Sequence, residues 1–201
     1  WKFEVRRIPN GLALTGGKEI VNTFTGDCNP ANAIYELLTD TEWGMGLPSS
    51  DVDLTNFTTA ANTLFDEGNG WAFVWDAERE ISEILAEIER QIDGRVYLDR
   101  GTGKWKIKLI RADYVLSSTT ILTEADVEIG DDWRKGDWSE TLNQVYVKHW
   151  VYDFVADDWK QSEVNAQDLA NFNIQGRFKP ARLDFPGVKD KALAQSLALE
   201  Q

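Results

Sequence analysis

The sequence is poor in the residues that most often perform chemistry in proteins. Its single cysteine, Cys28, excludes an intrachain disulfide and a cysteine-based metal cluster. Its single histidine, His149, excludes a histidine-rich metal site and leaves any serine or cysteine nucleophile only one candidate imidazole base. These absences narrow the enzyme chemistries that are open to the chain.

Long apolar runs and positive charge are also scarce. No stretch of about 18 apolar residues is present, so we expect no membrane insertion. The chain carries 34 acidic against 21 basic residues, a formal charge of −13. Because such a surface repels phosphate backbones, we expect no specific nucleic-acid binding. No tract of Pro, Ser or Gln predicts disorder, and 42% hydrophobic residues over 201 positions predict one large core or two small ones.

The N-terminal segment, residues 1–28, is predicted to be the end of a preceding domain. Residues 1–10 alternate apolar and polar side chains, the period of a half-buried strand, and glycines in residues 10–28 indicate turns around a short strand. The sequence starts at Trp1 without a methionine and stops at Gln201 inside a predicted helix. We therefore interpret the chain as an internal fragment of a longer polypeptide.

Residues 29–114 are predicted to form a compact α+β domain. Asn29 followed by Pro30 predicts a helix start, because the asparagine can cap and the proline lacks only a donor that would be orphaned. This helix should end near Asp40, before a loop that contains Trp43, Gly44 and Gly46. Ser50, Asp51 and Asp53 offer caps for a second helix that ends at Gly68.

The same domain is predicted to continue with a strand, a third helix and a hairpin. Trp71 to Trp75 is a short aromatic run typical of a strand. Isoleucines and a leucine at helical spacing follow, at positions 81, 84, 85, 88 and 92, with Asp76 as the expected cap and Gly94 as the expected stop. We expect Ile84, Leu85 and Ile88 to form the centre of the core. Residues 95–99 and 104–110 should then pair as a hairpin around the turn 100–103.

The remainder is predicted to be a linker or crossover, residues 115–140, and a β-rich unit, residues 141–201. Two strands are expected over 142–155 and 159–164, a helical turn over 166–173, another strand over 177–185 and a final helix after Pro186-Gly187. The predicted fold class is therefore α+β, with a helix, strand and hairpin domain followed by a β-rich unit.

Three motifs that resemble chemical sites have simpler structural explanations. The glutamates 78, 80, 83, 87 and 89 belong to the polar side of an amphipathic helix. Asp51 and Asp53 have the spacing that opens a calcium-binding loop, but the glycine and the glutamate of such a loop do not follow in register. Helix capping explains these two residues more simply. Gly101-Thr102-Gly103 lies between strands and opens no helix, so it lacks the dipole of a phosphate-binding loop. We therefore predict no catalytic residues, no cofactor and no metal.

The nine tryptophans are more numerous than a core of this size needs. Trp133, Trp138, Trp150 and Trp159 lie beside charged residues and are candidates for a subunit interface, where tryptophan is enriched. The alternative is that exposed tryptophans stack on sugar rings and form a carbohydrate-binding module.

Several stretches, taken in order, resemble the tail-tip attachment (J-like) proteins of long-tailed phages. The first two are CNPANAIYELLTDTEWGMGLPSSDVD, residues 28–53, and GWAFVWDAEREISEILAEIERQIDGRVYLDRGTGKWKIKLIRADY, residues 70–114. The strand with Asn143-Gln144-Val145 and the break at Phe185-Pro186-Gly187 also fall where that family has them. The occurrence of all these stretches in the same order is more specific for that family than any single stretch.

This resemblance implies a part of a trimeric baseplate hub that closes the tail tube of a phage or prophage. The implied location is the virion tail tip, and the implied partners are two further copies, a distal tail protein and a tape-measure protein. In that family this region acts as scaffold, so the resemblance implies no catalysis. Two alternatives stay open, a carbohydrate-binding module for the host cell surface and a tail-associated cell-wall hydrolase domain.

Overall fold

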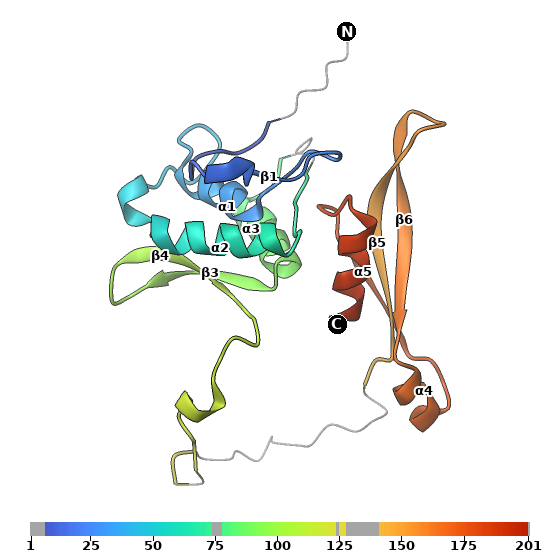
Figure 1. The fold of residues 1–201 in the computed structure, drawn as a ribbon. Coiled ribbons are helices and arrows are strands. Elements are labelled where there is room, and N and C mark those ends of the chain that lie inside the picture. The colour runs from blue at the N-terminus through green and yellow to red at the C-terminus, as the bar shows by residue number, and fades with distance from the viewer. Residues whose placement is uncertain (1–6, 74–77, 124, 128–140, 201) are drawn as a thin grey trace.

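The computed structural model describes residues 7–73, 78–123, 125–127 and 141–200. Within these residues the chain has five α-helices and seven strands arranged in small sheets, which confirms the predicted α+β class. The buried apolar side chains form two separate clusters, one from residues 28–109 and one from residues 145–198. Figure 1 shows the two corresponding units side by side.

The first unit packs three helices against a hairpin. The helices are α1 (Pro30–Thr39), α2 (Leu54–Asp66) and α3 (Ile81–Gln91), and the hairpin pairs β3 (Gly94–Asp99) with β4 (Lys104–Leu109). Helix α1 contacts both other helices, and α2 also contacts β4. The largest fully buried apolar side chains between these elements are Ile34, Leu38, Val52, Phe57, Leu64, Ile84, Ile88 and Ile92.

A short segment before α1 closes one side of this core. It contains a 3-10 turn, η1 (Thr15–Gly17), and the paired strands β1 (Ile20–Asn22) and β2 (Asp27–Cys28). Cys28 forms a bridge with Trp71 through two backbone hydrogen bonds of 2.9 Å. Leu12 and Leu14 pack against the same core. The predicted strand over residues 1–10 falls largely on residues 1–6, which lie outside the described residues.

Local start and stop signals explain the first two helices. Asn29 precedes α1, and its side chain accepts from the backbone N–H of Ala31, so the predicted cap is confirmed. Asp53 caps α2 by accepting from the N–H of Asn56, after a 3-10 turn, η2 (Ser49–Asp51). Gly68 lies just past α2 with φ of +69°, the left-handed conformation that ends helices.

Three expectations for the third helix are wrong. Its N-cap is Glu80 and not Asp76, and Glu80 makes no capping bond. After the helix, the residue with positive φ is Asp93, at +44°, while Gly94 is already the first residue of β3. Leu85 is only half-buried, so Ile84, Ile88 and Ile92 form this part of the core.

The predicted strand from Trp71 to Trp75 is not formed in the described part of that run. Trp71 makes one isolated bridge, residues 72 and 73 are not in a strand, and residues 74–77 lie outside the described residues. The backbone of Trp71 pairs with Cys28 and its ring packs in the first core. Trp71 is therefore joined to Cys28, the last residue of β2, by a single bridge and does not extend into a strand.

The second unit is a three-stranded sheet covered on one face by a helix. Its elements are β5 (Gln144–Asp153), β6 (Asp158–Gln167), α4 (Leu169–Gln175), β7 (Pro180–Asp184) and α5 (Lys191–Leu199). The strand order is β6-β5-β7, with β5 antiparallel to β6 and parallel to β7. Val145 and Val147 of β5 pack against Leu193 and Leu197 of α5. The expected strands, helical turn and final helix are thus present with shifted bounds.

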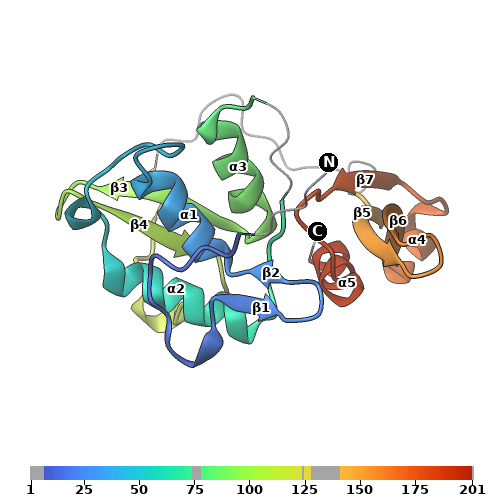
Figure 2. The ribbon, with the colours of Figure 1, turned by 90° about the horizontal axis from the view of Figure 1, so that it is seen from above.

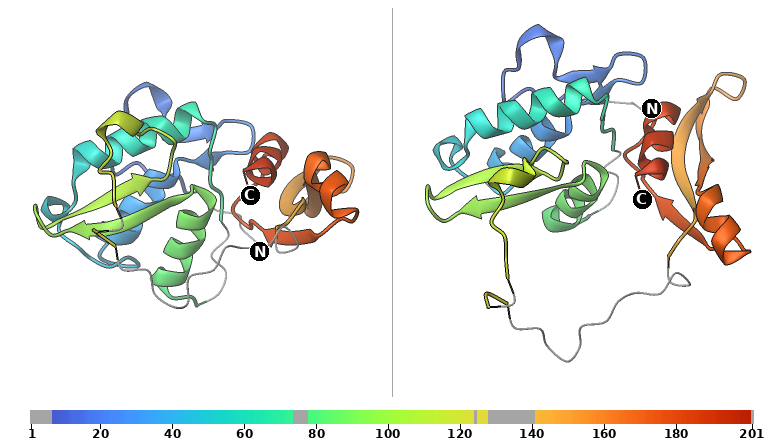
Figure 3. Two further views of the ribbon diagram at one scale, coloured as in Figure 1. Left: turned by 90° about the horizontal axis from the view of Figure 1, so that it is seen from below. Right: turned by 60° about the horizontal axis from the view of Figure 1, so that its bottom comes forward.

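Helix α5 lies between the sheet and the first unit (Figures 1 and 2). The other face of the sheet is turned away from the first unit. Beyond β4, residues 112–123 lead away from the first core and contain one 3-10 turn, η3 (Leu116–Ser118) (Figures 1 and 3).

Candidate interaction surface

The outer face of the β6-β5-β7 sheet carries a row of aromatic side chains. Successive strand residues point to opposite faces, and Val145 and Val147 point toward α5. Tyr146, Trp150 and Tyr152 therefore lie on the outer face. In the register of the sheet, Trp159 of β6 stands opposite Tyr152, with ring centroids 5.3 Å apart. Among the described elements, only α5 packs broadly on this sheet.

The charges on this outer face are balanced and partly cationic. Arg182 lies opposite Tyr146, with its guanidinium 5.1 Å from the tyrosine ring, and forms an ion pair of 3.4 Å with Glu163. Lys148 lies between Glu163 and Asp184 in the register. Aromatic residues and arginine, both present on this face, are enriched at protein interfaces.

One more cation completes this face. The ammonium of Lys189 lies 4.3 Å from the ring centroid of Trp159. The face thus has three cations, Lys148, Arg182 and Lys189, and two carboxylates. The whole chain has a formal charge of −13. We call this surface, from Tyr146 to Tyr152 with its partners on β6 and β7, the outer sheet face.

The turn between β5 and β6 extends the aromatic row toward the first unit. Phe154 contacts Tyr152 edge to face, with centroids 5.2 Å apart, and reaches Phe24 in the turn after β1 at 5.9 Å. The next residue, Val155, is 98% exposed. Below it, Asp153 accepts hydrogen bonds from the backbone of the turn and from Lys160, and the lysine bond in particular lowers the pKa of Asp153 to about 2.

The structure brings together two of the four tryptophans predicted at an interface. Trp150 and Trp159 lie on neighbouring strands of the outer sheet face and are half-buried. Trp133 and Trp138 lie outside the described residues. Sequence reasoning missed Tyr146 and Tyr152, although the alternation of Val145, Val147 and Val151 with aromatic residues could have found them.

The predicted motif around α1 serves the fold. Asn29 is fully buried, and its amide also donates to the carbonyls of Lys18 and Ala61. Trp43 is half-buried beneath the guanidinium of Arg7, 5.1 Å from its ring centroid. A side chain at Gly44 would come within 2.9 Å of three carbonyl oxygens at the end of α1.

The other glycines and Pro30 of this motif have simpler roles. Gly46 has φ of +67°, which favours glycine. Pro30 is the first residue of α1. A Cβ at Gly94 would come within 3.3 Å of Ile92 and Leu109, so Gly94 allows close packing instead of ending α3.

A junction joins the two units at residues 184–190. The N–H of Ala72 donates to the carbonyl of Gly187 at 2.9 Å, and Asn22 donates to the carboxylate of Asp190 at 3.1 Å. Arg90 donates to the carbonyl of Asp184 and lies 4.4 Å from the ring centroid of Phe185. From the sequence, Pro186-Gly187 was expected only to be a break before the final helix, whereas Gly187 lies in a contact between the two units.

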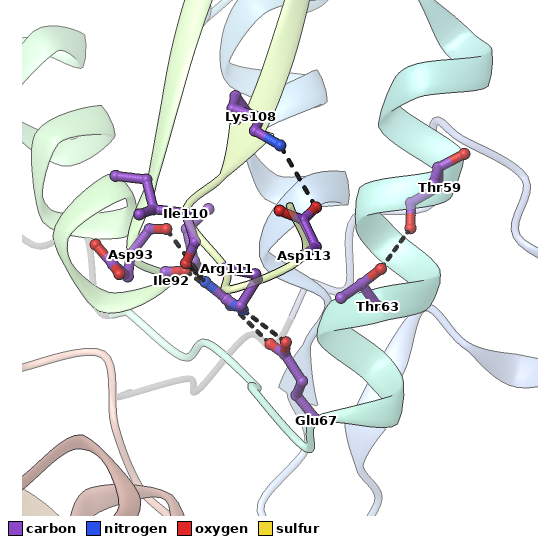
Figure 4. A network of polar contacts seen from close by, with 9 residues as sticks. All are labelled: Thr59, Thr63, Glu67, Ile92, Asp93, Lys108, Ile110, Arg111 and Asp113. Carbon is purple, nitrogen blue, oxygen red and sulfur yellow. Dashed lines mark hydrogen bonds and ion pairs between the residues drawn. The ribbon is translucent and has the colours of Figure 1, made fainter. Parts of the chain in front are cut away.

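Beside the junction, Arg111 forms hydrogen bonds with the C-terminal ends of both α2 and α3 (Figure 4). Its guanidinium forms two bonds of 2.7 Å with Glu67, the C-cap of α2, and donates to the carbonyls of Ile92 and Asp93 after α3. The hydrogen bonds with Glu67 raise the pKa of Arg111. Because the cation is fully engaged, it is suited to holding the fold and not to binding a ligand.

A hollow of about 250 Å³ lies between this network and α5. Its volume is below the roughly 300–1,000 Å³ of typical ligand pockets. Arg111 and Gln91, which line it, are both bonded to other groups of the chain. This hollow is therefore a weaker candidate for function than the outer sheet face.

The side chains that could act as a base, a nucleophile or a metal ligand are dispersed over the described residues. His149 is 1% exposed on β5, and burial lowers its pKa. Burial, with a smaller contribution from Asp27, raises the pKa of Cys28 to about 12, so its thiol stays protonated. Among the described residues, no three histidine, cysteine or carboxylate side chains gather as metal ligands, and no helix could cross a membrane.

The five glutamates predicted to face solvent, in α3 and just before it, fall into two groups. Glu78, Glu80 and Glu83 are exposed, whereas Glu87 and Glu89 are half-buried, and Glu87 pairs with Arg79 at 3.6 Å. Glu89 instead accepts from the N–H of Val96 at 2.6 Å and pairs with Arg95 at 2.9 Å, which fastens the helix to β3.

No known protein-family model matches the chain, and a search of curated proteins finds no relative of it.

Proposed function

We propose that the chain is a structural part of a bacteriophage or prophage tail tip, within the baseplate hub that closes the tail tube and supports host attachment and DNA delivery. It acts as scaffold and not as an enzyme. The ordered resemblance of residues 28–53 and 70–114 to tail-tip attachment proteins supports this assignment. The proposed partners are two further copies of the full-length protein, a distal tail protein and a tape-measure protein.

The outer sheet face is the observation that carries an assembly role. It places Tyr146, Trp150, Tyr152 and Trp159 on one surface that no described element covers. Large aromatic side chains supply much of the binding energy of protein interfaces, and the near-balanced charge avoids repulsion between acidic copies. A subunit contact on this face would remove these rings from water.

Immunogold electron microscopy tests the proposed location directly. Antibodies raised against the chain should label one end of the tail in particles produced by the strain that carries the gene. Antibodies preabsorbed with the purified chain serve as the control. Particles without label at the tail end, while the intact protein is present in the same lysate, contradict the proposal.

A carbohydrate-binding role is the second candidate, because the same aromatic rings could stack on sugars. A glycan array separates the two. Binding of a defined saccharide that is lost in Trp150→Ala favours this second role, and an array without signal favours assembly.

A further inference from the structure

The segment after β4 exposes an unusual number of apolar side chains. Leu116 is 77% exposed and Ile121 is 82% exposed, and Tyr114, Val115 and Leu122 are also exposed. We call residues 112–123 the arm. Soluble monomers rarely leave so many neighbouring apolar groups in water, and such clusters mark interaction sites.

Within the described residues the arm has one side-chain contact with the first unit, an exposed ion pair of 3.5 Å between Asp113 and Lys108 of β4, and its other hydrogen bonds are local. Ser118 and Thr119 bond to the carbonyls of Val115 and Leu116, and Thr123 bonds to Asp126. These contacts shape the arm, and beyond Asp113 none of them attaches it to either core. Figures 1 and 3 show it leading away from the first unit.

The arm and the outer sheet face are complementary in charge. The arm contains Asp113 and is followed by Asp126, and residues 112–133 contain no lysine or arginine. The face presents Lys148, Arg182 and Lys189 among aromatic rings. An apolar segment with acidic flanks therefore fits this face in both polarity and charge.

The edge of the sheet offers a further means of attachment. Strand β6 lies at the edge of the β6-β5-β7 sheet, so its outer backbone groups have no neighbouring strand among the described elements. An extended segment can pair with such an edge while its side chains contact the face.

Geometry favours contact between two molecules over contact within one. The arm lies on the first unit's side of α5, whereas the outer sheet face is turned away from the first unit (Figures 1 and 2). We propose that the arm of one copy packs across the outer sheet face of a second copy. This inference rests on the proposed assembly role and names the surfaces that meet.

Cysteine cross-linking tests this contact. One variant carries Ile121→Cys in the arm, and the other carries Gln161→Cys on the outer sheet face, where Gln161 is exposed opposite Trp150. The native Cys28 is buried and its thiol pKa is about 12, so it does not compete. Mixing the two variants under mild oxidation should give a disulfide between different chains.

Matched variants make the result specific. Thr59→Cys, at an exposed position of α2, replaces Ile121→Cys as the control and should give no bond to Gln161→Cys. Adding Leu116→Ser to the arm variant should reduce cross-linking about tenfold or more. Leu54→Ser, at another exposed leucine, should leave it unchanged.

The opposing outcomes are distinct. An intrachain disulfide in the Ile121→Cys, Gln161→Cys double variant, without linked chains, would overturn the proposal in favour of contact within one molecule. Cross-linking no stronger than the Thr59→Cys control would overturn it as well. Tail-end immunogold labelling together with a failed cross-link would leave the tail role intact and remove only this contact.

Discussion

Gly187→Ala should weaken the association between the two units. A Cβ at this position would fall well inside contact distance of the Trp71 indole and 2.9 Å from the side-chain oxygen of Gln91. Neither neighbour can move easily. The backbone N–H and carbonyl of Trp71 are both hydrogen-bonded to Cys28, and its ring stacks on Phe73 with centroids 5.3 Å apart. The Gln91 amide donates to the carbonyl of Gly70 at 2.8 Å.

Overpacking of this kind costs about 1–3 kcal/mol. For a chain of this length, about 2–4 °C of melting temperature correspond to each kcal/mol, so we expect a decrease of about 2–12 °C. Urea unfolding followed by tryptophan fluorescence should also show a broader or divided transition, because the two cores lose their coupling.

Gly101→Ala is the matched control for this substitution. A Cβ there would meet only the Asp99 carboxylate, at an ordinary contact distance of 3.4 Å. Its free energy of unfolding should stay within about 0.5 kcal/mol of the parent, as is usual for surface substitutions. If Gly187→Ala and Gly101→Ala unfold alike, the junction does not hold the units together as described.

Four further outcomes are expected. Asn29→Ala should destabilise the chain by about 2–4 kcal/mol, because it removes a cap and leaves the carbonyls of Lys18 and Ala61 without their donor; Asn29→Asp keeps the cap acceptor but should be no more stable, because its buried carboxylate would face the same two carbonyl oxygens. Ile88→Ala should cost about 2–5 kcal/mol, and the half-buried Leu85→Ala clearly less, in urea titrations. Stability should fall as pH drops below the ordinary histidine pKa of 6.5, because only the unfolded chain then protonates His149 readily, and His149→Leu should flatten that slope in melts from pH 8 to 5. Duplex DNA should not bind the chain at low salt, measured by fluorescence anisotropy.

Each of these has a contradicting result. Equal unfolding midpoints for Asn29→Ala and the parent would refute the cap, and equal costs for Leu85→Ala and Ile88→Ala would refute the described orientation of α3. A pH slope that persists unchanged in His149→Leu would assign the acid sensitivity to other groups. Micromolar DNA binding that weakens steeply with salt would refute the view that the acidic surface repels nucleic acid.

Local rules explain which parts of the fold could be predicted. The start of α1 at Asn29-Pro30 and the stop of α2 at Gly68 need only the residues themselves. The same rules failed at Gly94, because Asp93 takes the left-handed conformation that aspartate tolerates. Gly94 is instead required by side chains of Ile92 and Leu109, a contact that no local pattern encodes.

The other wrong predictions depended on contacts between residues that are far apart in the sequence. The aromatic run from Trp71 predicted a strand, but Trp71 pairs with one residue 43 positions earlier and packs where Gly187 approaches. At the candidate surface, residue type alone indicated Trp150 and Trp159. Their position together on one sheet face depends on the register of β5 and β6, which the sequence does not specify by itself.

Hydroxyl-radical footprinting at increasing protein concentration tests most directly whether the outer sheet face is an assembly surface. Trp150 and Trp159 should be oxidised readily in dilute solution and become protected as copies associate, while Trp43, in the first unit and half-buried, reports the radical dose. We expect Leu116→Ser to shift this protection to higher protein concentration. Oxidation of Trp150 and Trp159 at one unchanged rate relative to Trp43, from dilute to concentrated solution, would contradict it.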